Sequence, residues 1–131
     1  GACIVNEDKH IVGVGYNGMP NGCDDSVYPW GRTGDFADQK YPYVVHAELN
    51  AILNASTSLK GCRIYVSLFP CNECCKAIIQ SGIREVVYLS DKYAATDSTK
   101  ASKRMLASAG VTCRRMETDL TSVPVNFVAE E

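Results

Sequence analysis

The amino-acid sequence predicts an α/β fold, a layered domain with a mixed sheet of about five strands. Two β-rich segments open the chain, and strand-like and helix-like segments then alternate in the order ββ-α-β-α-β-α-β. The connections between these later segments are short. This pattern favours parallel pairing with right-handed crossovers after an opening hairpin.

The first half of the chain contains the hairpin, a long irregular stretch and one helix. The hairpin is expected at residues 2–5 and 10–17, with a polar turn between them. Residues 18–43 are rich in Gly, Pro, Asn and Asp and show no helical period. Irregular stretches of this length inside a compact domain are commonly functional. A helix is then expected to begin near His46, where alanine and leucine recur among good helix formers.

The second half completes the alternation. Strands are expected over residues 62–69, 84–90 and 111–116, and helices over residues 71–82 and 97–110. Gly82 and Gly110 are expected to end the two helices, and Asp97 to cap the start of the second. Residues 123–128 have the composition of a further edge strand, but Pro124 argues against that assignment.

Length and composition restrict the class of protein. With 131 residues, of which 46% are hydrophobic, the chain is expected to form a single domain over residues 1–131. It begins at Gly1, so we expect that a native N-terminal segment has been trimmed. No apolar run approaches the roughly 18 residues of a membrane span. The net charge of −2 argues against a nucleic-acid polymer as partner, because phosphate backbones select basic surfaces.

The chain has seven cysteines, an odd number that a secreted disulfide scaffold would not favour. We therefore expect a reduced protein located in the cytoplasm or the nucleus. Cys3, Cys62 and Cys113 lie in or beside predicted strands, and we expect them to be small core residues.

Three further cysteines stand close together in the segment LFPCNECCKAIIQ. Cys71 and Cys74 are three residues apart in the first turn of a predicted helix, so they share one face. The C-x-x-C spacing is typical of two ligands to one zinc ion, and a helix N-terminus favours anionic thiolates. Cys75 lies four residues after Cys71 and can occupy nearly the same sector. Spacing alone therefore leaves two pairings open.

A lone C-x-x-C could equally be a redox pair, but a further candidate ligand lies upstream. His46 opens a predicted helix and Glu48 follows two residues later, whereas His10 lies in the hairpin turn and is expected to be a surface residue. Three protein ligands leave one position of tetrahedral zinc open, which is typical of catalytic sites. Water bound there can have its pKa lowered to about 7.

The pattern H-x-E followed by P-C-x-x-C is the signature of zinc deaminases. The chain resembles the cytidine/deoxycytidylate deaminase superfamily, and within it the branch that acts on dCMP. The segments that carry the resemblance are GACIVN, GYNGMPNGC, YPYVVHAELNAILN, LFPCNECCKAIIQSGI and VVYLSDKY. The resemblance implies a three-layer α/β/α fold and hydrolysis of dCMP to dUMP and ammonia, which feeds dTMP synthesis. Beyond Arg114 it is uninformative.

The resemblance also implies roles for individual residues. Zinc would be held by His46, Cys71 and Cys74, Glu48 would shuttle protons, and Cys75 would pack beside the site. Four residues would contact the substrate: Asn17 at the sugar, the backbone near Ala47 at the base, and Lys92 and Tyr93 at the 5′-phosphate. Asn17 before Gly18 is equally typical of a turn, and Tyr93 of an exposed loop.

Finally, the resemblance implies regulation. Enzymes of this branch are homo-hexamers activated by dCTP and inhibited by dTTP, and Mg²⁺ would accompany a triphosphate. The glycine-rich loop GYNGMPNG lacks the pattern of a P-loop, yet its backbone amides could approach phosphate oxygens. The effector site is therefore expected at Gly15, Tyr16, Asn17, Gly18, Asn21 and Gly22. The alternatives are a cytidine, deoxycytidine or tRNA adenosine deaminase, and a zinc-stabilised binding module without catalysis.

Overall fold

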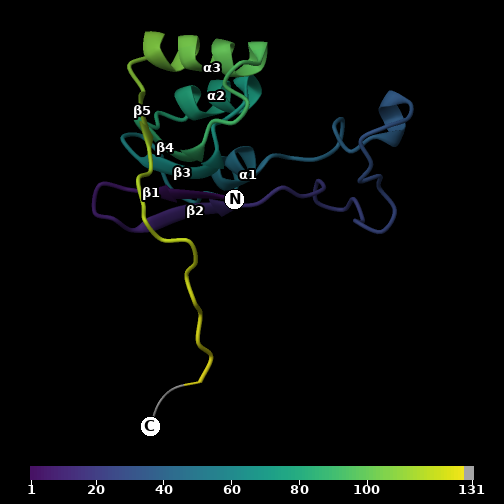
Figure 1. Ribbon diagram of the computed structural model, residues 1–131, viewed down its shortest axis with the longest axis horizontal. Coiled ribbons are helices and arrows are strands. Elements are labelled where there is room, and N and C mark those ends of the chain that lie inside the picture. Colours follow the sequence, from purple (N-terminus) through teal and green to yellow (C-terminus); the bar gives the residue numbers. More distant parts are fainter. Residues whose placement is uncertain (129–131) are drawn as a thin grey trace.

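The structure is a computed structural model in which residues 1–128 are described. Its sheet has five strands in the order β2-β1-β3-β4-β5. The strands are β1 (Ala2–Val5), β2 (Ile11–Gly15), β3 (Arg63–Leu68), β4 (Glu85–Ser90) and β5 (Thr112–Arg115). The helices are α1 (Ala47–Leu53), α2 (Asn72–Gln80), α3 (Asp97–Ser108) and the short 3₁₀ helix η1 (Phe36–Asp38). Figure 1 shows this arrangement.

The sheet is mixed, as the sequence predicts. β1 runs antiparallel to both β2 and β3, whereas β3, β4 and β5 are parallel to one another. The antiparallel part begins with the hairpin, and the parallel part follows from the two helical crossovers through α2 and α3. The α/β class, the hairpin and the alternation of strands and helices are therefore confirmed.

The three α-helices lie side by side on one face of the sheet. Since β3, β4 and β5 follow one another in the same direction, right-handed crossovers place α2 and α3 on the same face. α1 packs against α2 and against β1 and β2. The core forms between this helical layer and the sheet, from buried residues that include Ile4, Ile64, Ile78 and Leu106. The second helical layer of the expected α/β/α arrangement is not formed by residues 1–128.

The opposite face of the sheet is open. A shallow groove of about 420 Å³ lies over it, lined by apolar and aromatic residues such as Cys3, Val14, Tyr65 and Leu89. Residues 117–128 leave the end of β5 without regular secondary structure and run away from the sheet (Figure 1). The segment 123–128 is thus not a strand, in agreement with the argument from Pro124. No helix within residues 1–128 has the length and apolar character of a membrane span.

Two local predictions need correction. The N-cap of α3 is Thr96 and not Asp97, because the Thr96 hydroxyl accepts a hydrogen bond from the Thr99 amide. Cys113 is exposed, since β5 is an edge strand with every residue exposed, whereas Cys62 is buried as expected and Cys3 is partly buried. The two glycines that end helices are confirmed, with φ of +84° at Gly82 and +70° at Gly110.

The backbone of α1 lies directly on β2 because two glycines leave room for it. A Cβ atom at Gly13 would lie 2.6 Å from the Ala51 carbonyl oxygen, and one at Gly15 would overlap the Ala47 carbonyl oxygen and the Ala51 nitrogen. Only glycine permits so close an approach between two backbones. This contact sets the position of α1, whose first turn carries His46 and Glu48.

The irregular segment 18–43 is a long excursion whose ends are joined. Gly18 and Val45 form an isolated antiparallel bridge, with backbone N–O distances of 3.1 and 2.9 Å. In Figure 1 the segment extends sideways from the sheet and carries η1. Because Asn17 precedes Gly18 and His46 follows Val45, the bridge brings these two side chains close together.

Candidate metal centre and active site

Three candidate ligand atoms converge between the starts of α1 and α2. His46 is the N-cap residue of α1, Cys71 is the N-cap residue of α2, and Cys74 is the third residue of α2. The His46 Nδ1 atom lies 3.5 Å from Cys71 Sγ and 3.5 Å from Cys74 Sγ. The ligand atoms of all three residues lie within 4.8 Å of one another. The two short distances show that the side chains point at one common position.

This donor set fits a zinc ion. Zinc binds thiolate at about 2.3 Å and imidazole nitrogen at about 2.0–2.1 Å, so a tetrahedral centre separates sulfur and nitrogen by about 3.6 Å. The observed distances of 3.5 Å match that edge of the tetrahedron. Two thiolates and one imidazole are also ligands that zinc prefers over harder oxygen donors.

Electrostatics within the cluster favour anionic sulfur. The neighbouring Cys74 side chain and the His46 imidazole lower the pKa of Cys71 to about 3. Cys71 and burial raise the pKa of Cys74 above its ordinary value. The hydrogen bond to Cys71 also raises the pKa of His46. A metal cation at the common position would stabilise both sulfurs as thiolates.

Cys75 points elsewhere. Its side chain is fully buried in the core, and its Sγ lies 3.7 Å from the Pro70 carbonyl oxygen. Burial is the main cause that raises the pKa of Cys75 to about 11. The structure therefore places Cys74, and not Cys75, beside Cys71 and His46, although spacing alone allowed either pairing.

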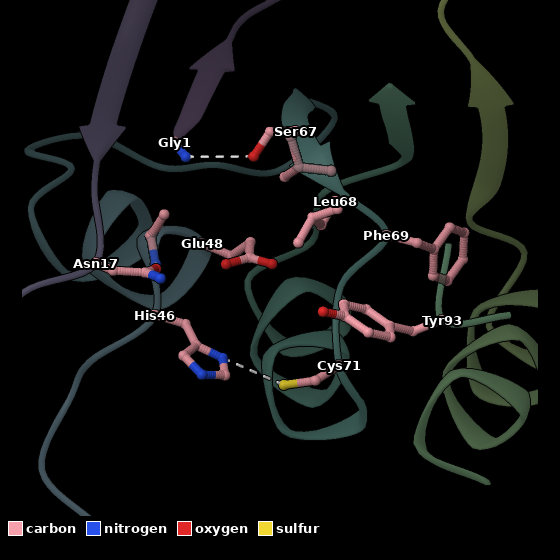
Figure 2. Close-up of a pocket in the computed structure, with 11 residues that line it drawn as sticks. Gly1, Asn17, His46, Glu48, Ser67, Leu68, Phe69, Cys71 and Tyr93 are labelled. Atoms are coloured by element: carbon pink, nitrogen blue, oxygen red, sulfur yellow. Dashed lines mark hydrogen bonds between the residues drawn. The ribbon is translucent and has the colours of Figure 1, made fainter. Parts of the chain in front are cut away.

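A pocket of about 230 Å³ opens beside the cluster. Figure 2 shows the Glu48 carboxylate pointing into it between Asn17 and the end of β3, with the Tyr93 hydroxyl on the far side. Glu48 is partly buried, and desolvation raises the pKa of its carboxyl above the ordinary value. A carboxyl group whose pKa moves toward neutrality is suited to give and take protons.

Three of the four candidate substrate-contacting residues lie at the pocket, and one does not. Asn17, Ala47 and Tyr93 line the pocket, whereas Lys92 does not and instead lies with its Nζ atom 5.1 Å from the centre of the Tyr93 ring. The Ala47 amide donates to Asn17 Oδ1 at 2.8 Å. A contact from that amide to a substrate therefore competes with Asn17.

Sequence reasoning missed the part of the pocket that comes from the end of β3. Ser67, Leu68 and Phe69 line it beside Cys71. Their position in the sequence could have indicated this role. α/β proteins bind ligands at the carboxyl ends of parallel strands, and these residues end the strand that leads into P-C-x-x-C.

The glycine-rich loop forms a separate, smaller hollow. Four of the six candidate effector residues, Gly15, Tyr16, Gly18 and Asn21, surround about 130 Å³ together with Asn50 and Asn54. Asn17 faces the larger pocket instead, and Gly22 lines neither.

Comparisons with known proteins agree with this site. Residues 1–90 match a family described as the cytidine and deoxycytidylate deaminase zinc-binding region. The human deoxycytidylate deaminase is 56% identical over 129 residues, which cover 97% of this chain and 72% of that protein. A probable deoxycytidylate deaminase of Drosophila melanogaster is 49% identical over 97% of this chain and 66% of its own length.

A solved structure shares the fold. The dCMP deaminase of cyanophage S-TIM5, crystallised with dCMP and dUMP, superposes with a TM-score of 0.66 at 27% identity. The superposition covers 88% of this chain and 79% of the phage protein. Fold, donor set and sequence identity together show that this chain belongs to the cytidine and deoxycytidylate deaminase family.

Proposed function

We propose that this chain deaminates dCMP hydrolytically, giving dUMP and ammonia. The observation that carries the proposal is the convergence of His46, Cys71 and Cys74 beside a pocket into which Glu48 points. Support comes from the human relative, a deoxycytidylate deaminase, and from the phage dCMP deaminase, whose structure contains dCMP and dUMP.

His46, Cys71 and Cys74 would hold zinc, which in a three-ligand site activates water for attack on carbon 4 of cytosine. Glu48 performs the proton transfers. Its carboxylate takes a proton from the attacking water and gives it to ring nitrogen 3, then carries the second proton of that water, from the new hydroxyl on carbon 4, to the departing amine. The bond from carbon 4 to the amino nitrogen breaks, a carbonyl replaces it, and ammonia leaves.

The remaining pocket residues position the nucleotide. Asn17 is expected at the sugar and the backbone near Ala47 at the base edge. The Tyr93 hydroxyl faces the pocket, so it is the nearer candidate for the 5′-phosphate, with Lys92 beside it. Phe69 is buried at the rim and stacks edge-on against Tyr88, with ring centres 4.9 Å apart. It provides a rigid apolar wall for a planar base.

The test replaces Glu48 with glutamine, which preserves shape but cannot accept a proton. Zinc content should stay near one ion per chain, while turnover of dCMP should fall by at least about 100-fold. Substantial turnover in a clean preparation would exclude the proposed role of Glu48. Parallel assays with cytidine, deoxycytidine and a tRNA anticodon stem distinguish the alternative deaminases, and absence of ammonia release from every substrate would indicate a binding module.

The proposal extends to regulation and assembly. dCTP, with Mg²⁺, is expected to activate and dTTP to inhibit through the loop at residues 15–22, part of which lines the smaller hollow together with Asn50 and Asn54. A homo-hexamer is also proposed, and contacts between its subunits would cover large apolar side chains that the irregular segment exposes, namely Val27, Trp30, Phe36 and Tyr41. The proposal also includes a single domain over residues 1–131, of which 129–131 lie outside the described residues. It further includes a cytoplasmic location and a supply of dUMP for dTMP synthesis.

Steady-state kinetics test the regulatory part. The regulatory part would be supported if the rate depends cooperatively on dCMP concentration, if dCTP makes that dependence hyperbolic, and if dTTP reverses the effect of dCTP. A hyperbolic dependence that is indifferent to both triphosphates would reject it while leaving the proposed catalysis intact.

A further inference from the structure

The two helices that carry the candidate ligands begin in the same unusual way. His46 occupies the N-cap of α1 and Cys71 the N-cap of α2, and neither side chain makes a capping hydrogen bond. By contrast, α3 is capped by the side chain of its own Thr96. The first amides of a helix have no partner within that helix, so α1 and α2 need acceptors from elsewhere.

Each of these helices obtains its cap from another element. The first amide of α1, at Ala47, donates to Asn17 Oδ1 at 2.8 Å. The first amide of α2, at Asn72, donates to Ser98 Oγ at 3.2 Å, and the same hydroxyl donates to Asn72 Oδ1 at 2.8 Å. Ser98 belongs to α3, which packs against α2. A side chain that serves as a ligand cannot also cap, and a neighbour replaces it.

The cap at α2 acts on the peptide group that joins Cys71 to Asn72. This group is planar, so its carbonyl and its amide move together. The Cys71 carbonyl accepts from the Cys75 amide at 2.9 Å, and the Asn72 amide donates to Ser98. Held at both ends, the peptide fixes the backbone of Cys71 and with it the direction in which Sγ points.

The Ser98 hydroxyl makes both of its hydrogen bonds to Asn72. It accepts from the Asn72 amide and donates to Asn72 Oδ1. Ser98 is partly buried between the two helices. Its hydroxyl therefore offers a defined acceptor rather than one of several surface contacts.

We propose that Ser98 is a positioning residue of the metal centre: its hydroxyl caps α2 from the neighbouring helix and orients Cys71 for metal binding. The inference rests on the proposed role of Cys71 as a ligand. Groups that orient metal ligands typically change metal affinity by about 10–100-fold when removed.

The experiment measures metal affinity apart from catalysis. Cobalt(II) is titrated into the apoprotein, the thiolate-to-cobalt absorption is followed, and zinc affinity is obtained by competition. S98A should weaken zinc binding by about 10-fold and reduce the thiolate absorption per bound cobalt. S98T keeps the hydroxyl and should bind as the wild type does. Ser98→Val has the shape of threonine without the hydroxyl, so it should behave like S98A and provides the matched comparison.

S102A controls for general loosening of the interface between α2 and α3. It removes a buried hydroxyl from the same helix without touching the Asn72 amide, so thermal stability should fall while metal affinity stays. Equal zinc affinities for S98T and Ser98→Val would overturn the role of Ser98. So would losses of zinc affinity in S98A and S102A that are proportional to their losses of thermal stability. If Cys71→Ala bound metal as tightly as the wild type, the proposed metal centre would fail as well.

Discussion

The contact between β2 and α1 supports a quantitative prediction about Gly15. In Gly15→Ala, the new methyl group would overlap the Ala47 carbonyl oxygen and the Ala51 nitrogen and lie 3.0 Å from the Asn50 carbonyl carbon. All of these atoms belong to the backbone of α1, so no side-chain rotation can relieve the overlap. Ordinary contact begins near 3.4 Å, and α1 must therefore move as a unit.

The required displacement is about 1 Å, and overpacking of this kind costs about 1–3 kcal/mol. We expect the upper end of that range because the obstructing atoms cannot repack. A shift of this size also exceeds the roughly 0.2 Å within which metal–ligand distances must lie. Since His46 begins α1, zinc affinity should fall together with stability.

Urea denaturation followed by far-ultraviolet circular dichroism measures the effect. A loss of about 3 kcal/mol should lower the midpoint by about 2 M. Gly31→Ala is the matched control, because nothing lies within 4 Å of a Cβ atom there, and its free energy of unfolding should change by less than about 0.5 kcal/mol. Equal midpoints and equal zinc contents for Gly15→Ala and Gly31→Ala would refute the argument that a glycine sets the position of α1.

Two further predictions concern the cysteines and the sheet. Metal analysis should show that Cys74→Ala loses zinc and that Cys75→Ala keeps one ion per chain. Denaturation should show that Cys75→Ala loses about 1–2 kcal/mol of stability. The reverse result for zinc would mean that the ligand pair is Cys71 and Cys75. Burial acts to raise the pKa of Glu85, but Arg114, at 3.1 Å, and Arg63 outweigh it and lower that pKa below its ordinary value. The carboxylate thus stabilises the fold above its unfolded-state pKa, and this contribution is lost as pH falls through the folded-state pKa. Glu85→Gln should lose about 1 kcal/mol at neutral pH and show a flatter decline of stability in acid, and an unchanged acid limb would contradict the assignment.

The fold could be predicted in outline because its signals are local. The turn at residues 6–9, the run of β-branched residues before Pro70 and the glycines after α2 and α3 each act within a few residues. The location of the helical layer was harder to predict, because the same alternation of strands and helices is compatible with helices on one face of the sheet or on both. Asp97 was mistaken for the cap of α3 because Thr96 and Asp97 both suit that position.

By itself, the sequence determined the chemical types of the donor set, namely a histidine, a P-C-x-x-C pair and a glutamate two residues after the histidine. These are carried by short spacings that any folded arrangement preserves. Only the tertiary structure decided which cysteine joins the cluster, because successive residues of α2 point about 100° apart and packing against the sheet sets the rotation of the helix. It also decided that Asn17 lies beside His46 and that Ser98 caps α2. Such contacts join residues far apart in the chain, and no local spacing specifies them.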